Sequence, residues 1–384
     1  MKFLHMSDLH IGKSIGAFSM AEEQRRAFDQ AIGCIRTEKP GAVLLAGDVY
    51  DRAVPGAEAV GLFDDLLTAL AREGVAVLLI PGNHDSPERL GFAGRLLAGS
   101  RIYFCGREMA MRKVTLPDEY GEVNFWLMPY TNPAKTRGLF GGQSEPETHQ
   151  EAVAAMLGAA GVDYGARNVL LSHQFYTKAG QKPERSDSEL DPLGGLDAVD
   201  AGLIERFDYA ALGHLHRGQS AGHPHIRYCG SPVKYSVSEI GHDKTLTLVE
   251  LRGKGEPIEI RLLPLSPLRG MRRIKGGLAE VTGAGYPGRE PSGDYIHVTL
   301  TDEEEIIGPM GKLRSVYPNA IGLEFENSRT AAADVLANAA AAPETESLSA
   351  YELFAQFFLE SQGGAMSAEQ AEIVREILER SEEE

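Results

Sequence analysis

Short apolar runs alternate with stretches of helical periodicity over the first 250 residues of the chain. Apolar residues three and four positions apart predict helices at 22–38 and 57–72. Short apolar runs between polar or glycine positions predict strands at 2–6, 42–46, 75–80, 125–128, 168–171, 209–212, 226–229 and 246–251. Strands that alternate with helices in this way are typical of an α/β domain.

The pattern changes at Leu-Pro-Leu-Ser-Pro, residues 263–267, which indicates a domain boundary. A smaller α/β segment follows, with strands expected at 295–300 and 321–325, and then an alanine-rich tract at 331–342. We therefore expect three parts, which span residues 1–265, 266–345 and 346–384.

Two amphipathic helices are predicted in the last part. Ser349 to Glu352 and Ser367 to Gln370 each have the spacing of a helix capping box. Apolar residues follow each box at helical spacing: Leu353, Phe354, Phe357 and Phe358 after the first, and Ile373, Val374, Ile377 and Leu378 after the second. Packing on their own domain and binding a partner both account for this pattern, and the Phe-rich first helix favours a partner.

The net charge of −17 argues against a protein that coats nucleic acid over its whole surface, although it permits a local basic path. No apolar run is long enough to predict a membrane span. The chain enters a polar motif at Ser7, which leaves no room for a signal peptide. Three scattered cysteines predict neither a disulfide framework nor a cysteine metal site, so we expect a cytoplasmic protein.

Five polar clusters each follow directly after a predicted strand. They contain residue types that bind divalent metals: Asp8 with His10, Asp48, Asn83 to Asp85, His173, and His214 with His216. Because ligands gather beyond the carboxyl ends of strands in open α/β sheets, we expect these side chains to meet. A spacing of two residues in extended backbone also places both members of a pair on one face.

The residue types indicate the kind of metal. Carboxylate, amide and imidazole ligands without thiolate suit manganese, iron or zinc. Seven ligands are too many for one tetrahedral ion but suit two ions, about 3.5–4 Å apart, that share a carboxylate. Glycines at 47, 82 and 213 indicate sharp turns or a close backbone approach to a bound ion. A single histidine is more often a packed residue, which is how we interpret His5 in its strand and His223 with His225 in a polar loop.

These motifs, D-x-H, G-D, G-N-H-D, H and G-H-x-H, occur in the order that resembles the calcineurin-like metallophosphoesterase superfamily. The surrounding residues resemble the DNA-nuclease branch of that superfamily at 4–13, 46–51, 82–90, 194–197, 208–217 and 230–236. The resemblance implies a metallophosphoesterase β-sandwich flanked by helices in four layers. It also implies a smaller α/β capping domain and C-terminal helices.

The resemblance further implies a role for each residue of the motifs. One metal would be held by Asp8, His10 and His216, the other by Asn83, His173 and His214, with Asp48 bridging. His84 would stand beside the scissile phosphate and assist the leaving oxygen, and Asp85 would orient His84 through a hydrogen bond. The expected cofactor is two Mn²⁺ ions, with other divalent metals possible.

The activity implied by the resemblance is 3′-to-5′ exonuclease and endonuclease cleavage of DNA, including hairpin opening, in double-strand-break repair. The implied partners are DNA and an SbcC-type ATPase, bound through the C-terminal helices by a homodimer within a heterotetramer. Arg52 stands where some relatives carry a histidine, which leaves the balance of the two activities open. Basic residues that could contact DNA, or could equally be solvated surface charges, are Lys13, Arg89, Arg217, Lys234, Arg272 and Arg273.

Two other functions are compatible with the same motifs. One is a phosphatase or phosphodiesterase for a small phosphoester or a phosphoprotein, which would use the same metal site. The other is a scaffold with a degenerate site, against which the complete ligand set argues. A second domain and the Phe-rich terminal helix favour the nuclease, because a small-substrate enzyme needs neither.

Overall fold

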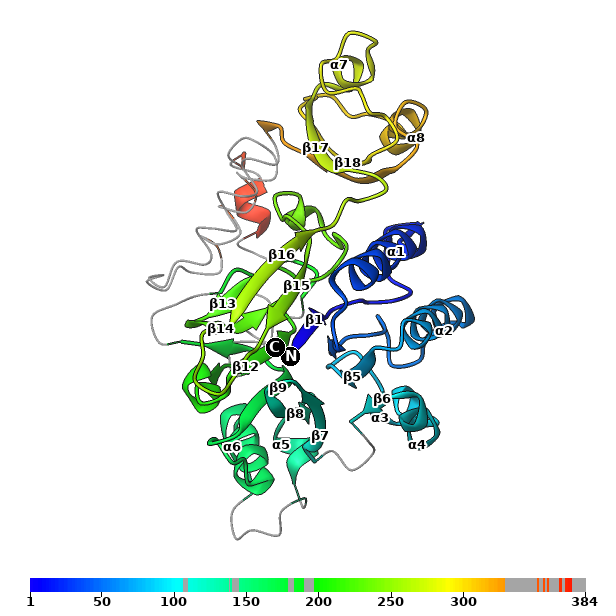
Figure 1. Ribbon diagram of the computed structural model, residues 1–384. Helices are drawn as coiled ribbons and strands as arrows, with labels where there is room; N and C mark the ends of the chain where they lie inside the picture. The colour runs from blue at the N-terminus through cyan, green and yellow to red at the C-terminus, as the bar shows by residue number, and fades with distance from the viewer. Residues whose placement is uncertain are drawn as a thin grey trace. The chain divides into compact units, whose positions relative to one another are not determined.

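The computed structural model describes residues 1–105, 110–137, 139, 145–178, 183–189 and 197–328, and, near the C-terminus, 351, 355, 358, 366–367 and 370–374. The chain forms two compact units, Met1–Arg272 and Arg273–Glu384 (Figure 1). Most of the predicted C-terminal helices, at 346–384, lies outside the described residues. The second capping box is present, because Gln370 N donates to Ser367 Oγ at 3.2 Å and Ser367 N to Gln370 Oε1 at 2.9 Å.

The first unit contains two six-stranded sheets. In the first sheet the order is β16 (Glu259–Pro264), β15 (Thr245–Glu250), β1 (Lys2–Met6), β4 (Ala42–Ala46), β5 (Ala76–Ile80) and β6 (Ile102–Phe104). Its strands β1, β4, β5 and β6 are parallel, while β15 and β16 are antiparallel to their neighbours. β4 and β5 are apolar and buried along their whole length, as parallel strands covered on both faces are.

In the second sheet the order is β13 (Gln219–Ala221), β14 (His223–Tyr228), β12 (Tyr209–Gly213), β9 (Arg167–His173), β8 (Gly121–Met128) and β7 (Arg112–Asp118). Its four inner strands are parallel, and the two edge strands are antiparallel. His223 and His225 lie on β14, so the predicted polar loop is wrong. They occupy part-exposed positions of a strand covered by only a short edge strand, which is why their polarity resembles that of a loop.

The two sheets face one another across an apolar core. Phe3 of β1 lies at its centre, with its ring centroid 5.9 Å from that of Phe125 on β8 and 5.5 Å from that of Tyr209 on β12. All three side chains are fully buried. This contact fixes the first sheet against the second, and with it the strand ends of both sheets.

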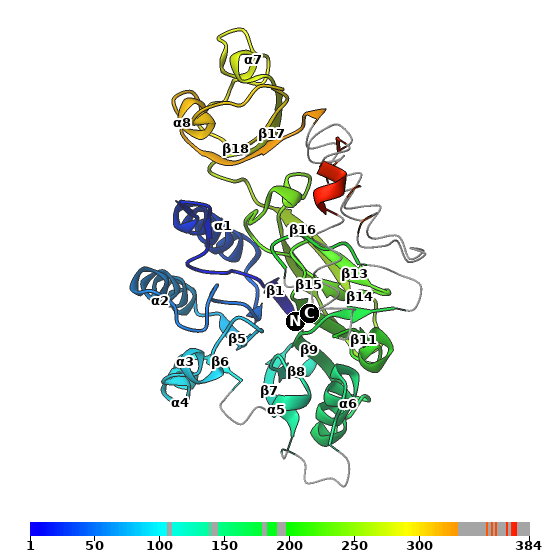
Figure 2. The same cartoon turned by 180° about the vertical axis from the view of Figure 1, so that it is seen from behind.

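Helices cover the outer faces of the two sheets, as the two views in Figures 1 and 2 show. α1 (Ala21–Glu38) and α2 (Ala57–Arg72) pack on the first sheet, and α6 (His149–Ala160) packs on the second. The predicted α/β class is confirmed. Within the described residues, none of the helices has the length and apolar character needed to cross a membrane.

Shorter elements complete the first unit. They are β2 (Ser14–Ile15), β3 (Phe18–Ser19), α3 (Pro87–Leu90), α4 (Gly94–Leu97), η1 (Ala98–Ser100), α5 (Pro133–Thr136), β10 (Tyr176–Thr177), β11 (Val199–Asp200), η3 (Ala201–Ile204) and η4 (Val237–Glu239). The second unit has a three-stranded sheet with its own core, formed by β17 (Met271–Gly276), β18 (Tyr295–Leu300) and β19 (Ala320–Phe325) together with α7 (Leu278–Thr282) and α8 (Pro309–Arg314).

We expect Phe3→Ala to lower the free energy of unfolding of the first unit by about 3–5 kcal/mol, because it leaves a cavity between the sheets. Trp126, the only tryptophan of the chain, is buried in β8 and reports this transition by fluorescence in urea. Phe92→Ala is the control, with an expected change below about 0.5 kcal/mol, because Phe92 is 80% exposed. Equal losses in both variants would contradict the central role of Phe3.

Candidate metal centre

Five strand ends bring the candidate ligands together. Asp8 and His10 follow β1, Asp48 follows β4 and Asn83 follows β5, all in the first sheet. The second sheet supplies His173 at the end of β9 and both His214 and His216 after β12. The parallel pairing of β1 and β4 continues past the strand ends, where His10 N donates to Asp48 O at 3.0 Å. The centre thus lies at the carboxyl edges of two facing sheets.

The backbone at the centre is strained. Four residues that are not glycine have positive φ angles there: Asp8 (52°), His10 (42°), Asp48 (47°) and His214 (104°). Residues with a Cβ rarely adopt this region, and such strain gathers at functional sites, where the surrounding structure enforces it.

Two glycines allow the strand ends to approach one another. A Cβ at Gly82 would lie 2.1 Å from Asp48 Oδ1, and one at Gly213 would lie 2.0 Å from Ala46 O. Of the two roles expected for these glycines, close approach is therefore the one that applies here. The neighbours are protein atoms, so the glycines let the ligand loops pack against each other.

One set of ligand atoms is formed by Asp8, His10 and His216. The Nε2 atoms of His10 and His216 are 3.1 Å apart, and all three residues offer ligand atoms within 4.8 Å of one another. Asp8 is fixed in place by His214 N, which donates to its Oδ1 at 2.9 Å, and by a hydrogen bond from Ser7 Oγ. The three ligand residues are buried.

A second set is formed by Asn83, His173 and His214. His173 Nε2 is 3.0 Å from Asn83 Oδ1, and His214 Nδ1 is 3.3 Å from the same oxygen. His173 Nδ1 donates to Ala46 O at 2.8 Å, which directs Nε2 into the centre. Asp48 lies between the two sets, with its Oδ2 at 3.3 Å from His173 Nε2 and 3.7 Å from that of His10.

The chemistry of these residues fits divalent cations. Oxygen and imidazole donors surround a space with no thiolate, and the buried His214 Nε2 has no hydrogen-bond partner among the described residues. Burial lowers the pKa of His173, but the neighbouring Asp48 carboxylate outweighs this and the pKa rises to about 9. The surroundings of Asp48 therefore favour positive charge, which a divalent ion supplies.

His84 lies at the rim of the centre, with its ring 18% exposed and its Nε2 at 4.0 Å from Asp48 Oδ2. Its Nδ1 hydrogen-bonds to the backbone carbonyl oxygen of Asp51 at 2.8 Å. The geometry also allows His84 to form a group of ligand atoms with His10 and Asp48. A position at the rim allows contact with a substrate from solvent.

Asp85 does not orient His84 through a hydrogen bond, and that prediction is wrong. Its carboxylate instead accepts three backbone N–H groups, from Val49 at 3.0 Å, Tyr50 at 2.9 Å and Gly82 at 2.9 Å. Both carboxylate oxygens are used in tying the loop after β5 to the loop after β4. Burial and the charge of Asp48 nevertheless raise the pKa of Asp85 to about 6. Asp85 thus positions His84 only indirectly, through the backbone.

A buried ion pair that the sequence analysis missed supports His216. Glu239 Oε1 is 3.1 Å from His216 Nδ1, and Ser188 Oγ is 2.8 Å from the same atom. Lys244 Nζ donates to Glu239 Oε2 at 2.6 Å and to His216 O at 2.9 Å. Although burial raises the pKa of Glu239, its hydrogen bond to His216 and the charge of Lys244 hold that pKa well below the usual range. A carboxylate on the outer nitrogen is the usual support of a metal-binding histidine.

The D-x-H loop has a second support that the sequence analysis missed. Gln24 of α1 donates through Nε2 to Leu9 O at 3.1 Å and to His10 O at 2.7 Å. Tyr235 also donates its hydroxyl to Leu9 O, and its ring lies 5.6 Å from that of His10. No local spacing marks these residues, because their partners are distant along the chain.

The structure pairs several of the basic residues proposed for DNA. Lys13 forms an ion pair with Asp51 at 2.8 Å, Arg217 pairs with Glu184, and Lys234 donates to a backbone carbonyl. Arg272 is half-buried, whereas Arg52, Arg89 and Arg273 are exposed. Their role in DNA binding stays a prediction.

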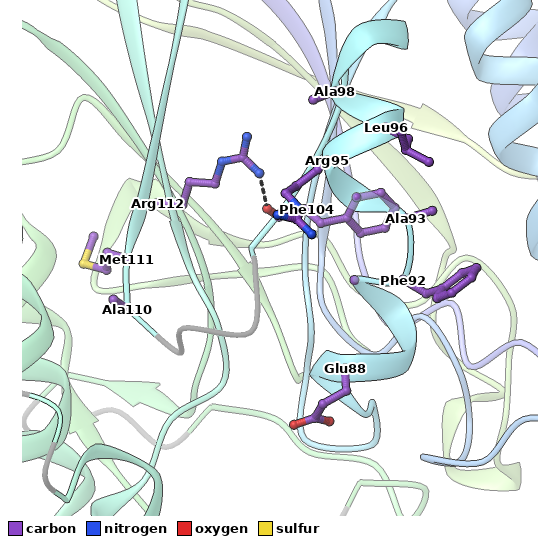
Figure 3. A pocket seen from close by; sticks show the side chains of 12 residues that line it. Glu88, Phe92, Ala93, Arg95, Leu96, Ala98, Phe104, Ala110, Met111 and Arg112 are labelled. Carbon is purple, nitrogen blue, oxygen red and sulfur yellow. Dashed lines mark hydrogen bonds between the residues drawn. The ribbon is translucent and has the colours of Figure 1, made fainter.

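A cavity of about 910 Å³ lies beside α3 and α4 (Figure 3). Arg112 crosses towards Phe104 from the opposite wall and donates to its carbonyl oxygen at 2.6 Å. None of the candidate ligands is among the described residues that line the cavity. The cavity is therefore separate from the metal centre.

Two family models match the chain. Calcineurin-like phosphoesterase matches residues 1–218, and Type 5 capsule protein repressor C-terminal domain matches residues 267–362. The chain belongs to the calcineurin-like phosphoesterase family, and it is a metal-dependent phosphodiester hydrolase.

Within that family the chain is similar to proteins named as the SbcD component of the nuclease SbcCD. It is 29% identical to the one from Staphylococcus epidermidis over 326 residues, which cover 84% of this chain and 85% of that protein. It is 30% identical to the one from Staphylococcus saprophyticus over 327 residues, 84% of each chain. The crystal structure of TT1561 of Thermus thermophilus is 12% identical, with a TM-score of 0.42 over 68% of this chain and 98% of that one, a likeness too low to bear on function.

We expect Glu239→Gln to weaken Mn²⁺ binding by about 10- to 100-fold, because a neutral amide no longer raises the basicity of His216. Calorimetric titration of chelator-treated protein with Mn²⁺ measures this. Asp118→Asn is the matched control, because it breaks a similarly buried ion pair, with Arg167, that has no contact with the centre. A similar loss of affinity in both variants would show that any buried ion pair has this effect.

Proposed function

We propose that the chain is a nuclease that hydrolyses DNA phosphodiesters with two metal ions. The observation that carries this proposal is the place of Asp48, whose Oδ2 lies between His10 Nε2 and His173 Nε2 at 3.7 and 3.3 Å. A carboxylate shared by two sets of ligands is what a two-metal centre requires. The name of the relatives supplies the class of substrate.

In this proposal the ions are Mn²⁺. Asp8, His10 and His216 hold one of them, Asn83, His173 and His214 hold the other, and Asp48 bridges the two. When bound, such ions neutralise the charge of the phosphodiester and clamp the attacking and leaving oxygens. The residues of the chain fix this geometry in advance, since most of them are buried and held by hydrogen bonds.

His84 is the proposed proton donor. Its Nδ1 is bonded to the carbonyl of Asp51, so Nε2 is the ring atom that can pass a proton to the departing sugar oxygen. Asp85 holds the backbone of the same loop through three N–H groups. His84 and Asp85 thus form the catalytic part of the site, with His84 in contact with the substrate.

The proposed assembly follows from the nuclease complex named in the relatives. A 3′-to-5′ exonuclease and endonuclease that opens hairpins would act in double-strand-break repair with an SbcC-type ATPase, as a homodimer within a heterotetramer. Residues 1–265 would form the nuclease domain and 266–345 a capping domain that contacts DNA, while 346–384 would bind the ATPase. The net charge of −17 supports a need for a basic partner surface.

We expect His84→Ala to keep its full Mn²⁺ content and to cleave DNA about 10²- to 10⁴-fold more slowly, because proton donation to the leaving oxygen is lost. Chelator-stripped protein is supplied with Mn²⁺ and tested on end-labelled linear and hairpin duplexes. His225→Ala, on β14, is the control and should cleave as the wild type does.

Loss of metal from the His84 variant would make His84 a ligand and overturn its proposed role. An aryl phosphodiester is tested in parallel. Turnover of that ester by the wild type without DNA cleavage would instead favour an enzyme for small phosphoesters.

A further inference from the structure

The loop that follows β8, residues 129–132, lies beside the metal centre, although it carries none of the motifs. Tyr130 N donates to Pro81 O at 3.0 Å, at the end of β5. On the other side Gln174 Nε2 donates to Thr131 O at 3.0 Å, directly after β9. The loop is therefore held between the two strand ends that supply Asn83 and His173.

This loop places a cation close to the centre. The Tyr130 ring lies 6.5 Å from the His173 ring, and Lys135 Nζ lies 4.8 Å from the centroid of the Tyr130 ring. An ammonium group at this distance is attracted by the face of the ring. Asn132 Oδ1 accepts Lys135 N at 2.9 Å, which fixes the start of α5 and hence the root of the lysine side chain.

The charge of Lys135 is not neutralised by an ion pair within the described part of the chain, in contrast to that of Lys13. The half-buried ammonium interacts electrostatically with Glu88, Asp48 and Asp85. Two of these carboxylates belong to the centre and its supporting loop. A partly desolvated cation directed towards a phosphoesterase centre is suited to an anionic group of the substrate.

We propose that Lys135, held on the Tyr130 ring, binds the phosphate next to the scissile one in the strand being cut. The inference rests on the proposed nuclease function and adds a means of selecting the substrate. A polynucleotide has a neighbouring phosphate for Lys135 to contact, whereas a small phosphodiester has none. Lys135 is then a residue that favours polymeric over small substrates.

Lys135→Met tests the proposal, because methionine keeps an apolar side chain against Tyr130 and removes the charge. Wild type and variant are assayed with Mn²⁺ on a single-stranded oligonucleotide and on bis(4-nitrophenyl) phosphate. We expect KM for the oligonucleotide to rise about 10-fold with kcat little changed, as for loss of one charge-assisted hydrogen bond. The slope of log(1/KM) against log salt should fall by about 0.7. The small ester should be hydrolysed as by the wild type.

Lys113→Met is the matched control. Lys113 Nζ lies 5.6 Å from the Trp126 ring in the same type of contact, but on the edge strand β7. This variant should leave both substrates unaffected. Lys135→Arg keeps the positive charge and should keep KM for the oligonucleotide within about 3-fold of the wild type.

Equal losses on both substrates, or an unchanged KM for the oligonucleotide, would overturn the role of Lys135. Failure of the wild type to cut the oligonucleotide is a separate result, which would overturn the proposed nuclease function. In that case the affinity for the same oligonucleotide, measured by fluorescence anisotropy, still decides. An unchanged Kd in Lys135→Met contradicts the inference and a Kd about 10-fold weaker supports it.

Discussion

The position of the Asp48 carboxylate is the constraint on which the rest of the site depends. Asp48 follows β4, with β1 and β5 on either side and the end of β9 in the facing sheet. Its Oδ1 accepts His84 N, and its Oδ2 faces an imidazole of each ligand set. The strained φ of Asp48 and the absence of a Cβ at Gly82 are both needed to bring it there. The packing of Phe3 between the sheets has its functional consequence at this carboxylate.

The strands that carry the centre were predictable because they are buried on both faces and end abruptly in polar residues. β1 and β4 have the predicted bounds, and β12 ends one residue later than predicted. The strand β14 was missed at His223 and His225, because polar residues on a part-exposed strand read as a loop. Candidate ligands could be recognised from spacing, since each cluster is local in sequence. Glu239, Gln24 and Lys135 could not, because their significance comes from partners brought near only by folding.

The metal centre by itself does not distinguish a nuclease from an enzyme for small phosphoesters. The same ligands would serve either substrate, so selectivity must come from groups around the centre. Lys135 lies on one side of it, while Lys13 and Arg217 are already paired with carboxylates. An acidic chain with so few unpaired cations near its centre, among the residues that the structure describes, is consistent with a nuclease that works together with a DNA-binding partner.

The most direct test of the two-metal account is anomalous diffraction from crystals of the wild-type protein soaked in Mn²⁺. The account predicts two anomalous peaks about 3.5–4 Å apart, with the Asp48 carboxylate between them. One peak should lie against Asp8, His10 and His216, and the other against Asn83, His173 and His214. A single fully occupied peak, or two peaks that do not share Asp48, would contradict it.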